Sequence, residues 1–543
     1  MRNLRLNLIF FLILFFAAAI LGRLFFIQVL QNDFYKALAQ GLFSSPNESQ
    51  TKRGEVFLKD GEPLAINKDF TLVFASPPEI LDAEKTTETL SEILHLDSNP
   101  PSTLQGKTTY DFILEKLKVD SLYSPIKNKL TQEEIDSLKN LKLPGIYTTK
   151  ERLRYYPQES LASQVVGFLG AQGSGQYGLE EYYDESLKGK SEGGDLTITI
   201  DYDIQFMAEK LLGRAKENLS IEEGQIIVMD PNSGKIIALA NFPDFNPNQY
   251  QEYATLGFLE IFKNGATQKF FEPGSVFKPI TFAAALEEGK ITPQTTYTDE
   301  GKVEILGRTI YNYDGRVYGQ QTMTNVLEKS INTGAVFVQS QLPHHIFLDY
   351  IQKFGIFEPT GIDLPEVYSE NEEFKKGYEI NFATASFGQG IQMTPLQLAR
   401  AYCAIANGGK LVKPYLVNGL VNGVEPRSSQ VISSKTASQL TAMIVSVVEN
   451  GFGKAAKIPG YYIAGKTGTA QISFSALEID KPGYSEKTIQ TFVGFFPAFS
   501  PQFLILIKLD NPKTKTAEYS ATPIFHDLAE YIIHYYQIPP DYE

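Results

Sequence analysis

From residue 272 the chain reads Glu272-Pro273-Gly274-Ser275-Val276-Phe277-Lys278-Pro279, a run that sets a hydroxyl and an amine one helical turn apart. Side chains at i and i+3 lie on the same face of a helix, so we expect the Lys278 amine to reach the Ser275 oxygen. Pro273 and Gly274 predict a helix that begins at the serine. Ser275 would then lie at the positive end of the helix dipole, where developing negative charge is stabilised. The run therefore predicts a serine nucleophile with its own base.

Two further motifs separate this pair from chance occurrences, of which roughly two are expected in a chain of this length. Ser330-Ile331-Asn332 follows the first pair, and Lys466-Thr467-Gly468-Thr469 comes later in the chain. A second pair, Ser124-Pro125-Ile126-Lys127, has no such followers at the same spacing. The order and spacing resemble the Ser-x-x-Lys, Ser-x-Asn and Lys-Thr-Gly set of penicillin-binding proteins and serine β-lactamases.

Length and composition restrict the classes of protein that the chain can belong to. With 543 residues, two or three domains are expected. The net charge of −14 argues against nucleic acid as a partner, because no basic stripe could neutralise phosphates. Cys403 is the single cysteine, which excludes an internal disulfide. The five histidines have no metal-ligand spacing, so we expect neither a metal nor a cofactor.

The N-terminus carries the only membrane signal in the sequence. Arg2 and Arg5 precede an apolar run, and a helix from Leu6 to Leu30 would be roughly 37 Å long, enough to span a bilayer. A cleaved signal peptide is the alternative, but the apolar run continues past residues 17–19, the candidate cleavage site. We expect an uncleaved single-pass anchor with a cytoplasmic N-terminus. Arg23 lies within the span, where it either reaches the outer interface or contacts another membrane protein.

Residues 31–194 carry none of the three motifs and form the expected second part of the chain. Residues 33–40 predict a short helix, and residues 53–67 predict a hairpin because Asp60-Gly61 separates alternating apolar residues. Amphipathic helices are expected between Pro78 and Leu143, for example Thr131 to Asn140. Gly193-Gly194 marks the boundary to the next domain.

Residues 195–543 predict an α/β domain with a mostly antiparallel sheet, because strands at both ends enclose a helical region. Residues 225–229 and 235–240 predict a hairpin, and strands are expected at 489–495 and 503–509. Helices are expected near Tyr202 and over 393–407, 435–449 and 523–536, the last at the end of the chain.

Taken as a whole, the chain resembles a class B penicillin-binding protein. The resemblance extends over nearly the full length, through segments outside the three motifs: Arg53-Gly54, Asp60-Gly61, residues 154–157, Gly178-Leu179-Glu180, residues 360–365, residues 386–390 and residues 465–471. It implies a transpeptidase domain with an inserted helical lobe, carried on an elongated α+β pedestal behind one membrane helix. Residues 31–190 do not resemble the glycosyltransferase domain of class A enzymes, so a monofunctional D,D-transpeptidase is implied. Asn332 and residues 152–189 resemble the division (septal) type more than the elongation type, which tends to carry an aspartate at the position of Asn332.

The resemblance also implies a substrate and a role for each motif residue. The substrate is a peptidoglycan stem peptide ending in D-Ala-D-Ala, with β-lactams as covalent inhibitors. Ser275 attacks, and Lys278 is the base, which requires that burial and a second cation, Lys466, keep it neutral. Ser330 relays a proton to the departing D-Ala amine, and Asn332 holds both Lys278 and a substrate amide carbonyl. The substrate-binding residues are Thr467 and Thr469, whose hydroxyls bind the terminal carboxylate, and Gly468; the N–H groups of Ser275 and Thr469 form the oxyanion hole.

The sequence leaves three other functions to consider. A β-lactamase is disfavoured by the long pedestal at residues 31–194, which that class of enzyme does not need. A penicillin-sensing receptor would require a cytoplasmic effector, for which only the few residues before Leu6 are available. A scaffold that activates a SEDS-family glycosyltransferase of the division or elongation machinery is compatible with catalysis, and such membrane proteins are the expected partners.

Overall fold

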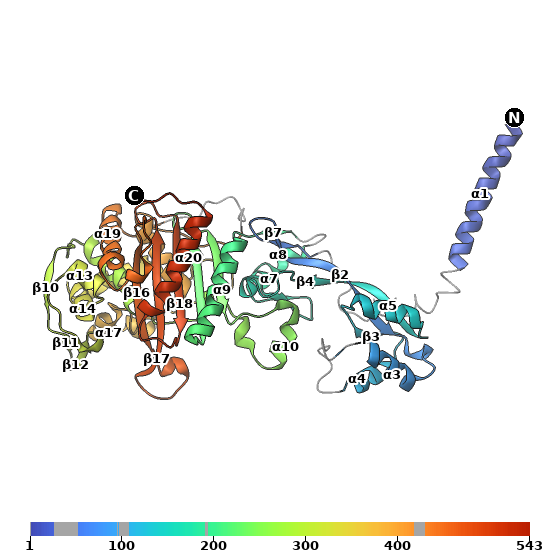
Figure 1. The fold of residues 1–543 in the computed structure, drawn as a ribbon, viewed down its shortest axis with the longest axis horizontal. Coiled ribbons are helices and arrows are strands. Elements are labelled where there is room, and N and C mark those ends of the chain that lie inside the picture. The colour runs from blue at the N-terminus through green and yellow to red at the C-terminus, as the bar shows by residue number, and fades with distance from the viewer. Residues whose placement is uncertain (1, 26–52, 95, 97–107, 190–193, 418–428) are drawn as a thin grey trace.

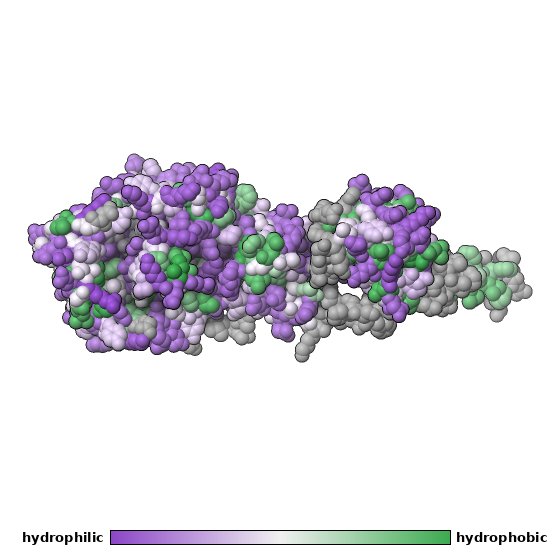
Figure 2. All heavy atoms as spheres, turned by 90° about the horizontal axis from the view of Figure 1, so that it is seen from below, coloured by the Kyte–Doolittle hydropathy of each residue, from purple (hydrophilic) through white to green (hydrophobic). Residues whose placement is uncertain are grey.

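The computed structural model describes residues 2–25, 53–94, 96, 108–189, 194–417 and 429–543. Its first helix, α1, spans Arg2–Phe25, and no helix within the described ranges has the length and apolarity that a membrane crossing needs. Phe11 and Phe15 of α1 are each 68% exposed. Figure 2 shows hydrophobic side chains on this helix at one end of the molecule, whereas the large domain at the other end has a mostly hydrophilic surface. The helix predicted over residues 33–40 lies outside the described residues.

The N-terminal sheet is built around one long strand, β2. In this five-stranded sheet β2 (Pro63–Ala75) pairs with β1 (Val56–Phe57), β3 (Ser124–Lys127) and β4 (Ile146–Tyr155), while β1 also pairs with β7 (Leu196–Thr197). The antiparallel pairing of β1 with β2 confirms the hairpin predicted at residues 53–67. Strand β7 lies after the predicted boundary at Gly194, yet it pairs with β1 of the N-terminal sheet. The first residues after that boundary therefore still belong to the N-terminal sheet.

Three amphipathic helices cover one end of this sheet, as predicted: α3 (Ala83–Ile93), α4 (Thr109–Lys118) and α5 (Gln132–Leu141). Each begins at a side-chain cap, and Thr131 forms a capping box with Glu134 at the start of α5. Their apolar faces pack on β2 and β3 around Val73, Leu90 and Ile113, all fully buried. The pedestal end therefore has its own small core.

A buried ion cluster joins three of the segments that carry the family resemblance. Arg53 Nε donates to Glu180 Oε2 at 2.7 Å, and Arg154 Nε donates to Glu180 Oε1, also at 2.7 Å. The side chain of Glu180 is fully buried. It lies in the short-element region formed by α6 (Ser163–Val166), β5 (Phe168–Leu169), β6 (Gly175–Gln176), α7 (Gly178–Tyr182) and α8 (Asp184–Lys188). A buried carboxylate shared by two guanidinium groups ties both ends of the pedestal chain together.

The C-terminal domain contains a five-stranded sheet in the order β16-β17-β18-β8-β9 (Figure 1). Its strands are β8 (Glu223–Met229), β9 (Ile236–Phe242), β16 (Ala464–Ser473), β17 (Tyr484–Phe496) and β18 (Phe503–Asp510). Every pairing is antiparallel, which confirms the predicted sheet and the β8–β9 hairpin. One face packs against α9 (Tyr202–Leu219) and the terminal helix α20 (Ala521–Tyr535) around a separate apolar core.

The helical region lies on the other face of the sheet and extends into a lobe. The helices are α12 (Lys278–Glu287), α13 (Met323–Glu328), α14 (Asn332–Ser340), α15 (His344–Lys353), α16 (Glu372–Lys375), α17 (Glu379–Ala385), α18 (Pro395–Ala406) and α19 (Ser434–Asn450), preceded by α10 (Tyr250–Thr255) and α11 (Gly265–Gln268). Short strands complete it: β10 (Thr296–Asp299), β11 (Lys302–Ile305), β12 (Arg308–Tyr311), β13 (Gly319–Thr322), β14 (Lys410–Leu411) and β15 (Ser429–Gln430). The helices predicted at 393–407, 435–449 and 523–536 are confirmed, with small shifts at their ends.

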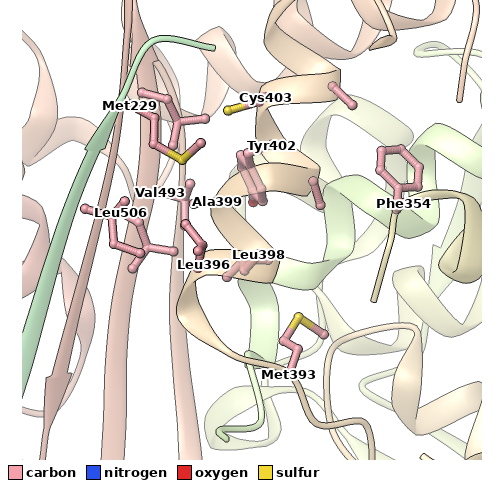
Figure 3. Close-up of a cluster of buried hydrophobic side chains, with 14 of the residues drawn as sticks. Met229, Phe354, Met393, Leu396, Leu398, Ala399, Tyr402, Cys403, Val493 and Leu506 are labelled. Carbon is pink, nitrogen blue, oxygen red and sulfur yellow. The ribbon is translucent and has the colours of Figure 1, made fainter. Parts of the chain in front are cut away.

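Helix α18 is one of the elements through which the helical region packs on the sheet (Figure 3). Leu396 and Ala399 lie with Met229, Val493 and Leu506 of the sheet in one buried cluster. The hydroxyl of Tyr402, also on α18, donates to the Val276 carbonyl at 2.6 Å. The main chain beside Ser275 is therefore attached directly to the core.

The helix predicted to begin at Ser275 begins later, at Lys278. Residues Gly274–Phe277 form a 3-10 turn, and α12 starts at Lys278. The reason is Pro279, which lacks the N–H group that an α-helix beginning at Ser275 would need to bond the Ser275 carbonyl. The Lys278 N–H instead bonds that carbonyl in the i to i+3 pattern.

Candidate active site

Ser275 and Lys278 lie next to each other on one side of the 3-10 turn. The amine Nζ of Lys278 is 2.9 Å from Ser275 Oγ. Gly274 makes the turn possible because its φ is +60°, and its N–H donates to the Gly388 carbonyl at 3.0 Å. A Cβ on Gly388 would lie 2.2 Å from the Gly274 oxygen, so the 386–390 segment can support the turn only with glycine there. Ser275 is half-buried, whereas Lys278 is fully buried.

Lys278 is surrounded by oxygen atoms. Besides Ser275, its Nζ contacts the Ser330 carbonyl at 2.7 Å, Asn332 Oδ1 at 2.9 Å and Ser330 Oγ at 3.3 Å. A neutral amine has two N–H donors and one lone pair. The Ser330 carbonyl and Asn332 Oδ1 are pure acceptors and occupy the two donors, so the lone pair is left for the hydroxyl of Ser275. This arrangement suits removal of the serine proton.

The orientation of the Asn332 amide is set by a second contact. Asn332 Nδ2 donates to the Tyr311 carbonyl at 3.1 Å. Because the amide nitrogen must face that carbonyl, the oxygen must face Lys278. Asn332 is also the first residue of α14, and Ser330, just before it, adopts a φ of +53°. The left-handed turn at Ser330 directs both its carbonyl and its hydroxyl toward the lysines.

Lys466 enters the site from β16, the edge strand of the sheet. Its Nζ donates to Ser330 Oγ at 2.9 Å and to the Thr467 carbonyl at 2.9 Å, and the side chain is fully buried. The structure therefore brings together five predicted site residues from three distant parts of the chain: Ser275, Lys278, Ser330, Asn332 and Lys466.

The electrostatics of the two amines follow from burial and proximity. Burial lowers the pKa of Lys278 well below its usual value, and the positive charge of Lys466 lowers it further. Burial lowers the pKa of Lys466 to about 7. Of the two amines, Lys278 therefore loses its proton more readily, and Lys466 holds its charge more readily.

The three residues after Lys466 lie along the same edge strand, with side chains that alternate between its faces. Gly468 faces the 3-10 turn that carries Ser275, since a Cβ at Gly468 would lie 2.9 Å from Val276 Cγ1 and 3.1 Å from the Pro273 carbonyl oxygen. The Thr469 hydroxyl accepts a hydrogen bond of 3.1 Å from the Ala517 N–H, which leaves its proton available to a ligand. Thr467 is buried, with 7% of its surface exposed.

Two contacts of the site have no signal in the sequence. The Tyr311 carbonyl and the Tyr402 hydroxyl both hold motif residues in place, but one is a main-chain atom and the other belongs to a core side chain. The rival Ser124-Lys127 pair lies on strand β3, not on a helix, so the two side chains do not share a helix face.

Other possible sites do not overlap with this cluster. A cavity of about 410 Å³ lies beside β8 and β9, lined among others by Glu223, Asn241 and Lys269, and none of the eight predicted site residues lines it. Among the described residues, no group of three or more His, Cys, Asp or Glu side chains could hold a metal ion.

Comparison with known families gives two matches that together extend over most of the chain. Residues 224–530 match the penicillin-binding protein transpeptidase domain, and residues 48–199 match the penicillin-binding protein dimerisation domain. The first match contains all eight predicted site residues.

Individual relatives are similar over nearly the whole chain. Stage V sporulation protein D of Bacillus subtilis is 30% identical over 528 residues, covering 90% of this chain and 79% of that protein. A peptidoglycan D,D-transpeptidase FtsI homolog of Mesostigma viride is 29% identical, covering 97% of this chain and 95% of that protein. Among solved structures, penicillin-binding protein 3 of Mycobacterium tuberculosis complexed with aztreonam is 26% identical with a TM-score of 0.69, covering 91% of this chain and 98% of that one.

Proposed function

Because the chain belongs to the class B penicillin-binding proteins, and is thus a serine-type peptidoglycan D,D-transpeptidase, we propose that Ser275, Lys278, Ser330, Asn332 and Lys466 carry out its acyl transfer. The observation that supports this assignment best is the 2.9 Å contact between a half-buried Ser275 hydroxyl and a fully buried Lys278 amine. A desolvated, neutral lysine beside a reachable hydroxyl is what base-assisted nucleophilic attack requires.

The first half-reaction acylates Ser275. Lys278 takes the hydroxyl proton while Oγ bonds to the carbonyl carbon of the penultimate D-Ala, and the carbonyl oxygen becomes an oxyanion near the N–H groups of Ser275 and Thr469. The oxyanion then re-forms the carbonyl, and the C–N bond to the terminal D-Ala breaks. Its amine leaves with the proton from Lys278, passed through the Ser330 hydroxyl 3.3 Å away.

In the second half-reaction an amine is the attacking group and Ser275 is the leaving group. An acceptor amine from a neighbouring stem peptide attacks the ester and loses a proton to Lys278, and Ser275 Oγ leaves with that proton. Before acylation, Lys466 supplies the charge that holds the terminal D-Ala carboxylate of the donor peptide, and the Thr467 and Thr469 hydroxyls bind the same carboxylate, which departs with D-Ala. Gly468 lets the donor peptide lie close to the strand.

The assignment is tested by covalent labelling with a fluorescent penicillin, whose acyl-enzyme should persist because no leaving group diffuses away. The label should map to the peptide that contains Ser275, and Ser275→Ala should abolish it. Ser124→Ala is the matched control, because it changes the rival serine and should label normally. Label on residues 124–127 would contradict the assignment.

The division into residues 1–30, 31–194 and 195–543 is also part of the proposal. It is supported by the separate core beneath α3, α4 and α5 and by strand β16, which carries the Lys466 motif in the other sheet. The apolar, exposed side chains of α1 support attachment of residues 1–30 to the bacterial cell membrane as a single-pass anchor, with the catalytic domain extracytoplasmic. Protease added to intact spheroplasts should then digest the catalytic domain; its protection would place the domain in the cytoplasm.

A role in septal wall synthesis, beside a SEDS-family glycosyltransferase and other division proteins, is the finer part of the proposal. It is supported by the asparagine at position 332 and by a folded pedestal without motif residues, which catalysis alone would not need. Replacement of the Leu6 to Leu30 segment by an unrelated spanning helix should leave penicillin labelling intact and weaken copurification with the glycosyltransferase. Unchanged copurification would remove the N-terminal segment from this interface.

A further inference from the structure

A buried carboxylate outside the three motifs, Asp299, lies behind Asn332. It is the last residue of β10 and is 2% exposed. It accepts hydrogen bonds from the Gly301 N–H at 3.1 Å, the Tyr318 N–H at 2.8 Å, Asn312 Nδ2 at 2.9 and 3.0 Å, and the Thr333 hydroxyl at 2.5 Å. These donors are all neutral and come from four separate places in the lobe. Such a carboxylate holds several segments in fixed positions because each bond is charge-assisted.

The carboxylate acts on both sides of the Asn332 amide. On one side, Asn312 is bonded to Asp299, and the Asn312 N–H donates to the Gly301 carbonyl at 3.1 Å. The peptide group that contains this N–H also contains the Tyr311 carbonyl, the acceptor for Asn332 Nδ2. On the other side, Thr333 follows Asn332 directly, and its N–H donates to Asn312 Oδ1 at 3.1 Å. The amide and its acceptor are thus fixed by one network.

The orientation of the amide matters because an asparagine amide with its oxygen and nitrogen exchanged has nearly the same shape. In that orientation it would present N–H groups to the Lys278 amine in place of an acceptor. Lys278 would then lose one of its two acceptors, and its lone pair would no longer be directed at Ser275 alone. The bond to the Tyr311 carbonyl favours the productive orientation, so whatever fixes that carbonyl also fixes the base.

We infer that Asp299 is a positioning residue for acyl transfer: through Asn312 and the Tyr311 carbonyl it holds Asn332 so that Oδ1 faces the Lys278 amine. The inference rests on the proposed role of Lys278 as base. It extends the catalytic arrangement to a residue between the first two motifs that belongs to none of the three.

Penicillin acylation of the full-length chain tests the inference, with the rate constant at saturation measured separately from the dissociation constant of the non-covalent complex. Asp299→Asn keeps the shape and removes the charge, so acylation at saturation should fall about tenfold or more, with the dissociation constant changed less than about threefold. Asp363→Asn is the matched control. Asp363 is 4% exposed and also accepts from main-chain N–H groups and a hydroxyl, those of Leu416, Val417 and Tyr183. Per folded molecule, its acylation rate should stay at the wild-type value.

A double-mutant cycle with Asn332→Ala separates positioning from a general weakening of the lobe. If Asp299 acts through Asn332, Asp299→Asn should change the rate less than about twofold in the Asn332→Ala background. Full multiplication of the two effects would overturn the inference, as would wild-type acylation by Asp299→Asn. Thr333→Val, which removes one bond to Asp299, should show a smaller loss with the same dependence on Asn332 and serves if Asp299→Asn does not fold. If Ser275→Ala still labelled, the proposed function would fail; if only the Asp299 effects were missing, this inference alone would fail.

Discussion

One hydroxyl group connects the two buried amines of the site: Ser330 Oγ lies 2.9 Å from the Nζ of Lys466 and 3.3 Å from the Nζ of Lys278. Two ammonium groups this close and out of contact with water would repel each other strongly. This repulsion favours loss of the proton from Lys278, and the Ser330 hydroxyl offers a path for its transfer. This relationship makes the two lysines distinguishable by substitution and by pH.

Substitution by arginine should affect the two lysines unequally. Lys278→Arg keeps the positive charge but cannot lose its proton, so penicillin acylation should fall by at least about a hundredfold, the usual contribution of a general base. Lys466→Arg keeps the positive charge that its role requires, so it should lower the acylation rate less than Lys278→Arg does. Stopped-flow acylation measures both. Wild-type acylation by Lys278→Arg would place the base elsewhere.

The pH dependence of acylation should be bell-shaped. On the acid side, protonation of Lys278 removes the base; because burial and Lys466 lower its pKa, the amine is already neutral at pH values where an ordinary lysine is charged. On the alkaline side, Lys466 loses its charge as the pH rises through its pKa of about 7. The second-order rate constant, which reports the free enzyme, should therefore decline above about pH 7.

At saturating penicillin the decline of the acylation rate constant should begin at a higher pH, because the bound carboxylate stabilises the Lys466 ammonium. Lys466→Arg should remove the limb, since arginine stays protonated. An alkaline limb that Lys466→Arg leaves unchanged would assign the titration to another group.

Gly468→Ala should push the 3-10 turn that carries Ser275 away from the edge strand β16. The added Cβ would lie 2.9 Å from Val276 Cγ1 and 3.1 Å from the Pro273 oxygen, so Ser275 would have to move. Acylation should fall about tenfold or more while the protein still folds. Gly213→Ala on α9 is the control, because nothing lies within 4 Å of its Cβ position. Equal rates for both variants would show that the close approach at Gly468 has no part in catalysis.

Glu180→Gln should destabilise the pedestal without touching the active site. The substitution removes the carboxylate that the buried Arg154 is paired with, whereas Arg53 keeps its second ion pair, with Asp184 at 2.8 Å. Removing one partner of a buried pair costs about 3–5 kcal/mol. Denaturation monitored by intrinsic tyrosine fluorescence, with penicillin labelling of the folded protein as second readout, checks this. Asp69→Asn breaks the exposed Asp69–Arg152 pair and should change the stability little. A Glu180→Gln protein as stable as wild type would mean that the cluster serves another purpose.

The sequence predicts those elements whose signals are local. The β8–β9 hairpin follows from two apolar runs around Asp230-Pro231-Asn232-Ser233-Gly234, and α18 follows from helical periodicity after Thr394, which caps it. Strand β3 has no such signal, because residues 124–127 are too few to show a period, and only pairing with β2 makes them a strand. The helical spacing of Ser275 and Lys278 places the start of α12 too early, because it takes no account of the N–H group that Pro279 lacks.

The candidate site divides in the same way. The sequence by itself determined which residue types are available: a serine and a lysine at helical spacing, a serine with an asparagine, and a lysine with small residues on a strand. Only the tertiary structure decided that Lys466 donates to the distant Ser330 and that the Tyr311 carbonyl orients Asn332. The physical reason is the nature of the contacts. Local order arises from side-chain periodicity and caps within a few residues, whereas desolvation of the Lys278 amine and the direction of its lone pair depend on packing between the sheet, α12, α14 and the β10–β12 segment.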